Sequence, residues 1–204
     1  QGTGANTLNG DIKTSGNVDL KGTSRTTTFE LDRAITTTMN GANGVITLGT
    51  TNAAYGLTLN SGSGTINLSG VGVAGDGMLP TSLAWLILTG TGTNNLAGSI
   101  TSFGQVNLKG TSRVTNVALS QAIASGASDL TIGNVNLSNG VTLTLGVAGV
   151  SNISMDSITG PGSGSANVTF SNNASRASDG INYVSNTGTV TVNGSIGTNI
   201  GTLW

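Results

Sequence analysis

Apolar and polar residues alternate in short runs along most of the chain. A triad of one apolar residue, one other residue and a second apolar residue recurs every ten or so positions, and its middle member is usually Thr, Asn, Ser or Asp. Side chains of a strand point to alternate faces, so the outer members are predicted to enter a core and the middle one to face solvent. The predicted strands include residues 18–20, 29–31, 46–48, 57–59, 66–68, 86–88, 106–108, 117–119, 130–132, 135–137, 141–143, 153–155, 168–170 and 190–192.

The segments between triads have the composition of tight turns. Gly, Asn and Ser dominate them, as in NSGSG at residues 60–64 and NGANG at residues 40–44. Gly and Asn adopt positive φ angles at low cost, which turns require. The only prolines are Pro80 and Pro161, as expected of strands that are hydrogen-bonded on both sides.

An internal sequence repeat indicates which of the all-β folds such strands form. Residues 2–25 and 90–113 are identical at 15 of 24 positions, and a weaker match continues to residues 46–49 and 130–133 after a deletion of four residues, which we expect to lie in a loop. A β-sandwich has one closed core and does not require an internal sequence repeat, whereas a solenoid is built by adding equivalent turns. We therefore predict an all-β fold, a right-handed parallel β-helix (β-solenoid), with Asn and Thr forming ladders between turns.

The whole chain, residues 1–204, is predicted to be a single continuous solenoid. The internal repeat covers about residues 2–69 and 90–158, and a loop insertion near residues 70–85 interrupts the pattern. A second loosely patterned stretch covers residues 160–180.

Composition and charge narrow the classes of function. The chain is 36% apolar with a net charge of −1, which favours folding over disorder. With 7 basic and 8 acidic residues it lacks the positive field that nucleic acid or an anionic membrane surface requires. Cys and His are absent, which removes thiolate chemistry and the usual near-neutral acid or base. No apolar run is long enough for membrane insertion, and no metal or cofactor is predicted.

Three stretches resemble a known family. LTLNSGSGTINLSG from Leu57, TGTGTNNLAGSITS from Thr89 and TGTVTVNGSIG from Thr187 are similar to the repeats of filamentous-haemagglutinin-type exoproteins and autotransporter passengers. The resemblance covers most of the chain and implies a bacterial, extracellular or cell-surface β-helix. The secretion domain and outer-membrane barrel associated with such systems are not recognisable, so we expect a fragment or a processed product.

Two acidic motifs could indicate chemistry. Glu30 and Asp32 lie at i and i+2 and are expected on one strand face, where paired carboxylates could cleave a polysaccharide. The second copy of the repeat has Ala118 and Ser120 at these positions, which favours a solvated pair over a catalytic one. Asp76 lies in a GDG sequence faintly similar to calcium-binding repeats, but a single copy cannot supply enough ligands. We predict no catalytic residues and no enzyme.

Four basic residues recur with the repeat. Lys21 and Arg25 correspond to Lys109 and Arg113. They could form two equivalent surface contacts for an acidic glycan or partner, or solvate a turn and discourage edge pairing, and the second reading is favoured.

Three hypotheses for function follow from the sequence. The first is a structural or adhesive segment of a bacterial exoprotein, whose partner could be a host surface or a glycan receptor. The second is a self-assembling filament or surface-layer subunit that stacks end to end. The third is a carbohydrate-active β-helix.

Overall fold

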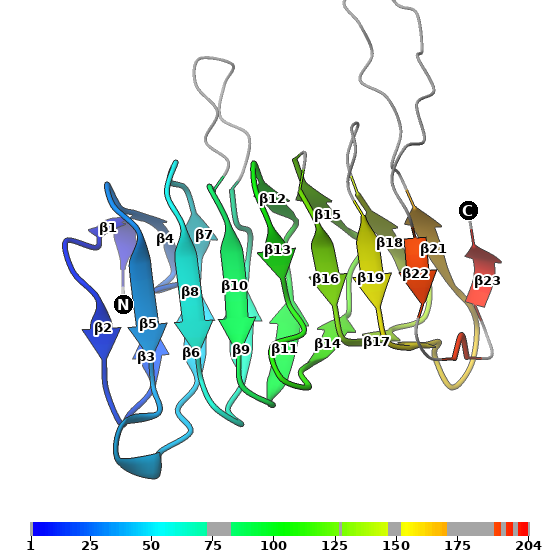
Figure 1. Ribbon diagram of the computed structural model, residues 1–204, viewed down its shortest axis with the longest axis horizontal. Coiled ribbons are helices and arrows are strands. Elements are labelled where there is room, and N and C mark those ends of the chain that lie inside the picture. Colours follow the sequence, from blue (N-terminus) through cyan, green and yellow to red (C-terminus); the bar gives the residue numbers. More distant parts are fainter. Residues whose placement is uncertain are drawn as a thin grey trace, which may run out of the picture.

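The chain forms a β-solenoid of about seven turns with almost no helix (Figure 1). The structure is a computed structural model that describes residues 2–72, 83–126, 128–146, 152–170, 190–192, 195–197 and 200–203. Short strands from successive turns stack in parallel, so each turn, or rung, pairs with the rungs before and after it. The predicted β-solenoid architecture is confirmed.

Most rungs contribute one strand to each of three faces. The first face contains β1 (Thr3–Thr7), β4 (Ser24–Thr28) and β7 (Thr50–Thr51), then β12 (Ile100–Ser102), β15 (Gln121–Ser125), β18 (Thr142–Leu145), β21 (Ala166–Phe170) and β23 (Ile200–Leu203). Bridges from Val71 to Thr51 and to Ile100 join its two parts.

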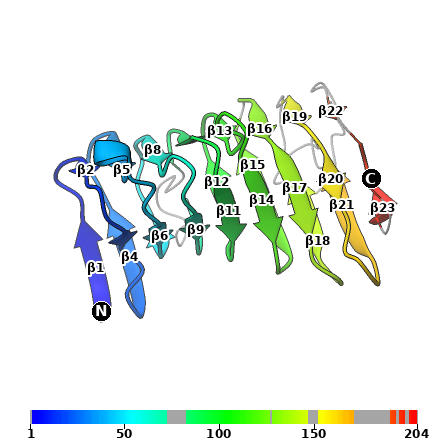
Figure 2. The same cartoon turned by 90° about the horizontal axis from the view of Figure 1, so that it is seen from below.

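The other two faces run the length of the body (Figure 2). The second contains β2 (Ile12–Lys13), β5 (Arg33–Thr36), β8 (Leu57–Asn60), β10 (Leu86–Thr89), β13 (Val106–Asn107), β16 (Leu130–Ile132), β19 (Ile153–Met155) and β22 (Val190–Val192). The third contains β3 (Val18–Asp19), β6 (Ile46–Leu48), β9 (Ile66–Leu68), β11 (Thr93–Leu96), β14 (Val114–Val117), β17 (Asn134–Leu137) and β20 (Ile158–Thr159). We call the turns between the first and second faces the first corner, those between the second and third faces the second corner, and those between the third and first faces the third corner.

The core is a set of apolar columns parallel to the solenoid axis. On the second face, for example, the register stacks Leu57, Leu86, Val106, Leu130 and Ile153 on one another. These side chains are almost completely buried. An apolar residue at each inward position therefore stabilises the rung on either side of it as well as its own.

Two of the predicted triads lie mostly or wholly beyond the end of a strand. β4 ends before residues 29–31, and β14 ends at the first residue of 117–119, so Leu31 and Leu119 lie in corners and are each 60% exposed. These leucines occupy equivalent places in the repeat. Alternation continued past the end of each strand because apolar residues also occur at the corners.

An asparagine ladder runs along the third face, as the sequence predicted. Asn67 donates to the Thr47 hydroxyl at 3.1 Å, and Asn95 donates to Asn67 at 2.8 Å. Asn116 and Asn136 continue the chain, each donating to the previous asparagine at 3.1 Å. Because each of these amides donates to the preceding rung, the side chains add a second ladder outside the backbone ladder.

The internal repeat is out of phase with the turns. β1 on the first face corresponds in sequence to β11 on the third, β2 on the second face to β12 on the first, and β3 on the third face to β13 on the second. The repeat length is therefore not a whole number of turns. Equivalent residues of the two copies point away from the axis in different directions.

The four-residue deletion falls at a corner. The residues missing from the second copy lie between β5 and β6, where the first copy has the 3-10 helix η1 (Met39–Gly41). Residues 73–82 of the predicted insertion, including Asp76, lie outside the described residues, as do residues 171–180 of the second loosely patterned stretch.

Thr51 offers a stability prediction inside the core. Its side chain is fully buried on the first face beside Val71, and its hydroxyl has no hydrogen-bond partner within the described residues. A buried hydroxyl without a partner is unfavourable, and Val has nearly the same shape. We expect Thr51→Val to raise the free energy of unfolding by about 1 kcal/mol in urea titrations.

Thr27 is the matched control for this substitution. It is stacked on Thr51 and equally buried, but its hydroxyl accepts a hydrogen bond from Asn6. Thr27→Val should therefore lower the stability. Equal changes in the free energy of unfolding would show that the missing hydrogen-bond partner of Thr51 does not affect stability.

Candidate functional site

The four repeat-related basic residues lie at two different corners. Lys21 and Arg25 are at the third corner and the start of β4, whereas Lys109 and Arg113 are at the second corner before β14. They do not form two equivalent surface spots, because the repeat is shifted by one face. Lys21 is exposed, and the ammonium of Lys109 lies 2.8 Å from a carboxylate oxygen of Asp156, two rungs further along.

Arg113 is buried, and all five of its guanidinium N–H groups have an acceptor. Nη1 donates to the carbonyls of Gly62 and Thr89 at 3.2 and 3.0 Å. Nη2 donates to the carbonyls of Gly64 and Thr93 at 2.9 Å each, and Nε donates to the side-chain oxygen of Asn94. A guanidinium has five donors, so this one is fully satisfied.

The acceptors of Arg113 belong to the two preceding rungs. Gly64, Gly92 and Arg113 lie at equivalent positions before β9, β11 and β14, so the side chain runs parallel to the axis and joins three rungs. Its acceptors are neutral oxygens. Burial lowers the pKa of Arg113 to about 10, which leaves it charged at neutral pH. Arg113 therefore has a structural role and offers no surface to a partner.

Arg25 has the same kinds of neighbouring residue as Arg113 but fewer hydrogen-bond partners within the described residues. Asn6 beside Arg25 and Asn94 beside Arg113 make the same contacts. Each asparagine amide donates to a leucine carbonyl and to a threonine hydroxyl, and its oxygen accepts a hydrogen bond from the arginine. For Arg25 the bond to Asn6 at 2.8 Å is the only one within the described residues. No described rung stands two positions before β4, where Arg113 finds Gly62 and Gly64.

The structure places the acidic pair in a turn and not on a strand. Glu30 and Asp32 lie at the first corner between β4 and β5, so the prediction that they share a strand face is wrong. Both are exposed, and one oxygen of Asp32 accepts the backbone N–H of Gly56 at 2.8 Å. Within the described ranges, no group of three or more acidic residues could hold a metal ion. No helix in the same ranges is long and apolar enough to span a membrane.

Three aromatic side chains come together at the first corner, which sequence reasoning missed. Tyr55, Trp85 and Phe103 lie on successive rungs: the carbonyl of Tyr55 accepts from Ala84, and the N–H of Phe103 donates to Leu83. Tyr55 is 40% and Phe103 71% exposed. The indole of Trp85 lies against Gly56, where a Cβ would come within 2.0 Å of it. We call these three residues the aromatic strip.

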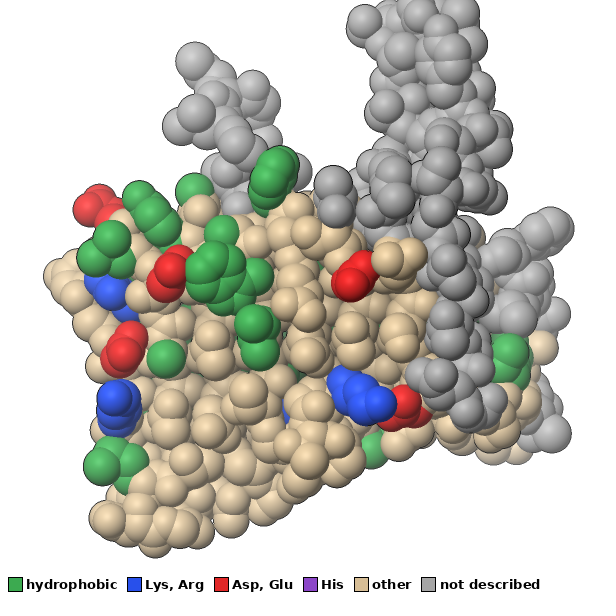
Figure 3. Space-filling view, viewed as in Figure 1, with side chains coloured by type: hydrophobic (Ala, Val, Ile, Leu, Met, Phe, Trp, Pro, Cys, Tyr) green, Lys and Arg blue, Asp and Glu red, His purple; other side chains and the backbone are tan. Residues whose placement is uncertain are grey.

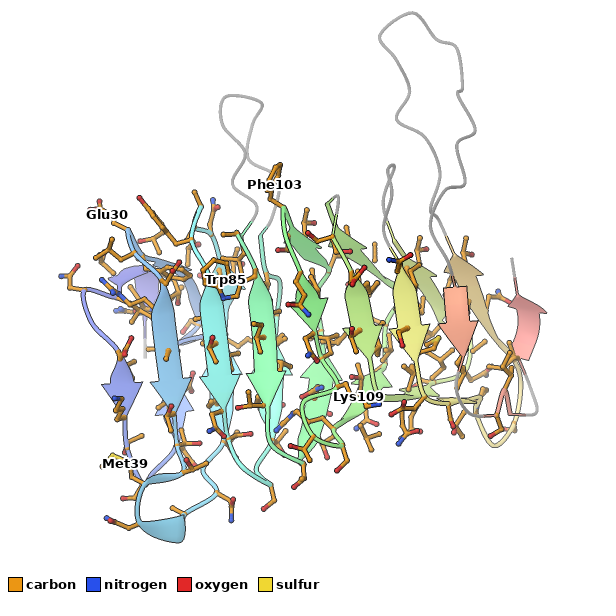
Figure 4. All side chains as sticks on the ribbon, viewed as in Figure 1. Glu30, Met39, Trp85, Phe103 and Lys109 are labelled. Atoms are coloured by element: carbon orange, nitrogen blue, oxygen red, sulfur yellow. The ribbon has the colours of Figure 1, made fainter. Side chains whose placement is uncertain are left out.

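Hydrophobic side chains gather on the surface over the upper ends of β5, β8 and β10 (Figure 3). Figure 4 shows Trp85 lying over the upper end of β8 and Phe103 projecting away from the body. Leu31 extends the apolar surface by one rung toward the N-terminus. Of the aromatic residues whose side chains are described, the remaining one, Phe29, is buried.

The charges around the strip are mainly negative. Asp11, Glu30, Asp32 and Asp129 are exposed at the same corner. Arg33 is the basic residue there, and its guanidinium donates to the carbonyls of Leu8 and Asn9 at 3.0 Å each, as well as to that of Asp32. Its donors are thus directed to the preceding rung and to its own corner. The corner offers hydrogen-bond acceptors beside aromatic faces.

No family model matches the chain, and the comparisons with curated proteins and with solved structures found no match.

Proposed function

We propose that the chain is a non-enzymatic, rigid structural and adhesive segment of a bacterial extracellular or cell-surface exoprotein, of the filamentous-haemagglutinin or autotransporter-passenger type. The observation that carries the proposal is the interlocking of rungs over the length of the body. Backbone ladders bond each described rung to the next, the asparagine ladder links the rungs from Thr47 to Asn136, and Arg113 joins three rungs. Such a body suits a spacer that holds its lateral surface in a fixed geometry. The resemblance in repeat pattern supports the family and the location.

Rigidity can be measured by native-state hydrogen exchange. With rungs about 4.8 Å apart, seven turns make a body about 35 Å long, and a rigid spacer should protect the strands of the middle rungs uniformly. We expect slow exchange for the strands β8 to β18, and the slowest where Arg113 joins three rungs. Rapid exchange throughout these strands would be incompatible with a rigid spacer. A glycosidase or lyase activity lost in Glu30→Gln or Asp32→Asn would replace the proposal with an enzyme.

A second candidate, end-to-end stacking, is favoured by Arg25. Within the described residues, its guanidinium has one hydrogen-bond partner where that of Arg113 has five, and β1, β2 and β3 each pair with one strand. The carbonyls of a rung stacked before β1 could satisfy the remaining donors. Negative-stain electron microscopy over a range of concentrations tests this candidate. Filaments that grow with concentration and are lost in Arg25→Met would establish stacking, and dispersed particles at all concentrations would reject it.

A further inference from the structure

We infer that the aromatic strip at the first corner binds an uncharged polysaccharide through its aromatic side chains. The inference rests on the proposed adhesive function and gives it a ligand class. Its parts are Tyr55, Trp85 and Phe103 as stacking surfaces, with the exposed carboxylate of Asp32 and amide of Gln105 beside them.

The arrangement suits a linear polymer. Backbone hydrogen bonds place Tyr55, Trp85 and Phe103 on three successive rungs, about 4.8 Å apart. The three residues occupy different positions of the corner, and the indole of Trp85 lies over Gly56, on the rung of Tyr55. The aromatic surface therefore extends along the axis over three rungs, as a polymer chain lying along the corner requires.

The chemistry of the corner suits a sugar. An aromatic face packs on the apolar C–H face of a pyranose ring, whose hydroxyls then project sideways. Asp32 gives one carboxylate oxygen to the N–H of Gly56, which fixes the carboxylate next to Tyr55 and leaves its second oxygen as an acceptor. Gln105, two residues after Phe103, is exposed and adds an amide that can both donate and accept.

The charge of the corner selects against anionic ligands. Four exposed carboxylates lie along it, and the donors of Arg33 are directed to backbone carbonyls. An acidic polysaccharide would be repelled. A protein partner is a poorer fit, since the strip is one side chain wide and protein interfaces surround a central cluster with contacts that exclude water.

Affinity electrophoresis in native gels tests the inference with known probes. Gels contain hydroxyethylcellulose or galactomannan, which are soluble and uncharged, or polygalacturonate, which is anionic. We expect retardation by at least one uncharged polymer and none by polygalacturonate. Phe103→Ala and Tyr55→Ala should each weaken the binding about ten-fold. Both side chains are exposed, so neither change should impair folding.

Leu119→Ala is the matched control. Leu119 is 60% exposed, but it lies at the third corner, away from the strip, and its removal should leave the retardation unchanged. The inference is overturned if neither uncharged polymer retards the protein, if only polygalacturonate does, or if Leu119→Ala weakens binding as much as Phe103→Ala. It is also overturned if light scattering shows a dimer that Phe103→Ala dissociates, because a second copy then covers the strip. None of these results would bear on the rigidity measured by hydrogen exchange.

Discussion

Replacing Arg113 with Met is expected to lower the free energy of unfolding by about 3 kcal/mol. Met has a similar length and no donors, so the substitution leaves the carbonyls of Gly64, Thr89 and Thr93 without the guanidinium that they now bond. These oxygens belong to the backbone and remain after the substitution. The free-energy cost of removing them from water is then no longer offset by hydrogen bonds to the guanidinium. Urea titration followed by circular dichroism measures the loss.

Arg25 provides a control within the same molecule. Arg25→Met removes the same side chain from the same local sequence but breaks one hydrogen bond, that to Asn6, so we expect a loss of about 1 kcal/mol or less. Arg113→Lys should fall between the two, because an ammonium has three donors and lacks the planar fork of a guanidinium. If Arg113→Met and Arg25→Met cost the same, the bonds to the two preceding rungs contribute nothing to stability.

The solenoid and its columns could be predicted from the sequence because they depend on local alternation. Triads such as Ile46–Leu48 and Leu57–Leu59 place two apolar side chains on one side of a strand, whatever the length of the next turn. A ladder of Asn and Thr side chains could also be predicted, because the middle residues of stacked triads lie next to one another on adjacent rungs. Alternation could not tell that Leu31 lies beyond the end of its strand.

The role of Arg113 was hidden because it depends on register. Arg25 and Arg113 lie in the same GTSR sequence, and nothing near either residue shows that only the second has two described rungs before it. Burial of an arginine is uncommon unless every donor is paired. Here the pairing comes from Gly62 and Gly64, two rungs away.

The aromatic strip was hidden for a related reason. Tyr55, Trp85 and Phe103 are unequally spaced in the sequence, because the rung that contains Trp85 also carries the insertion of residues 73–82. A fixed period therefore does not place them on one corner. The signal that could have found them is that each lies shortly before a strand of the second face, β8, β10 or β13.

Gly92→Ala should cost about 3 kcal/mol, near the upper end of what overpacking of a well-packed site costs. A Cβ at Gly92 would lie 2.0 Å from the carbonyl oxygen of Gly64 on the preceding rung, so the two corners would have to separate. Gly10→Ala is the control, since a Cβ there meets nothing within 4 Å and its φ is not in the left-handed region. It should change stability by about 0.5 kcal/mol or less. Similar losses from both changes would mean that glycine matters here only through backbone entropy.

The close approach at Gly92 and the bonds of Arg113 should be energetically coupled. Nη2 of Arg113 donates to the carbonyls of both Gly64 and Thr93 and so holds their two corners close together. A side chain larger than that of glycine at residue 92 would not fit in this close approach. Without the guanidinium the corners can separate, so Gly92→Ala should cost less in the Arg113→Met background than in the wild type. A double-mutant cycle in urea should give a coupling of about 1 kcal/mol. Strict additivity would show that the backbone ladders alone set the distance between corners and that Arg113 only fills the space they leave.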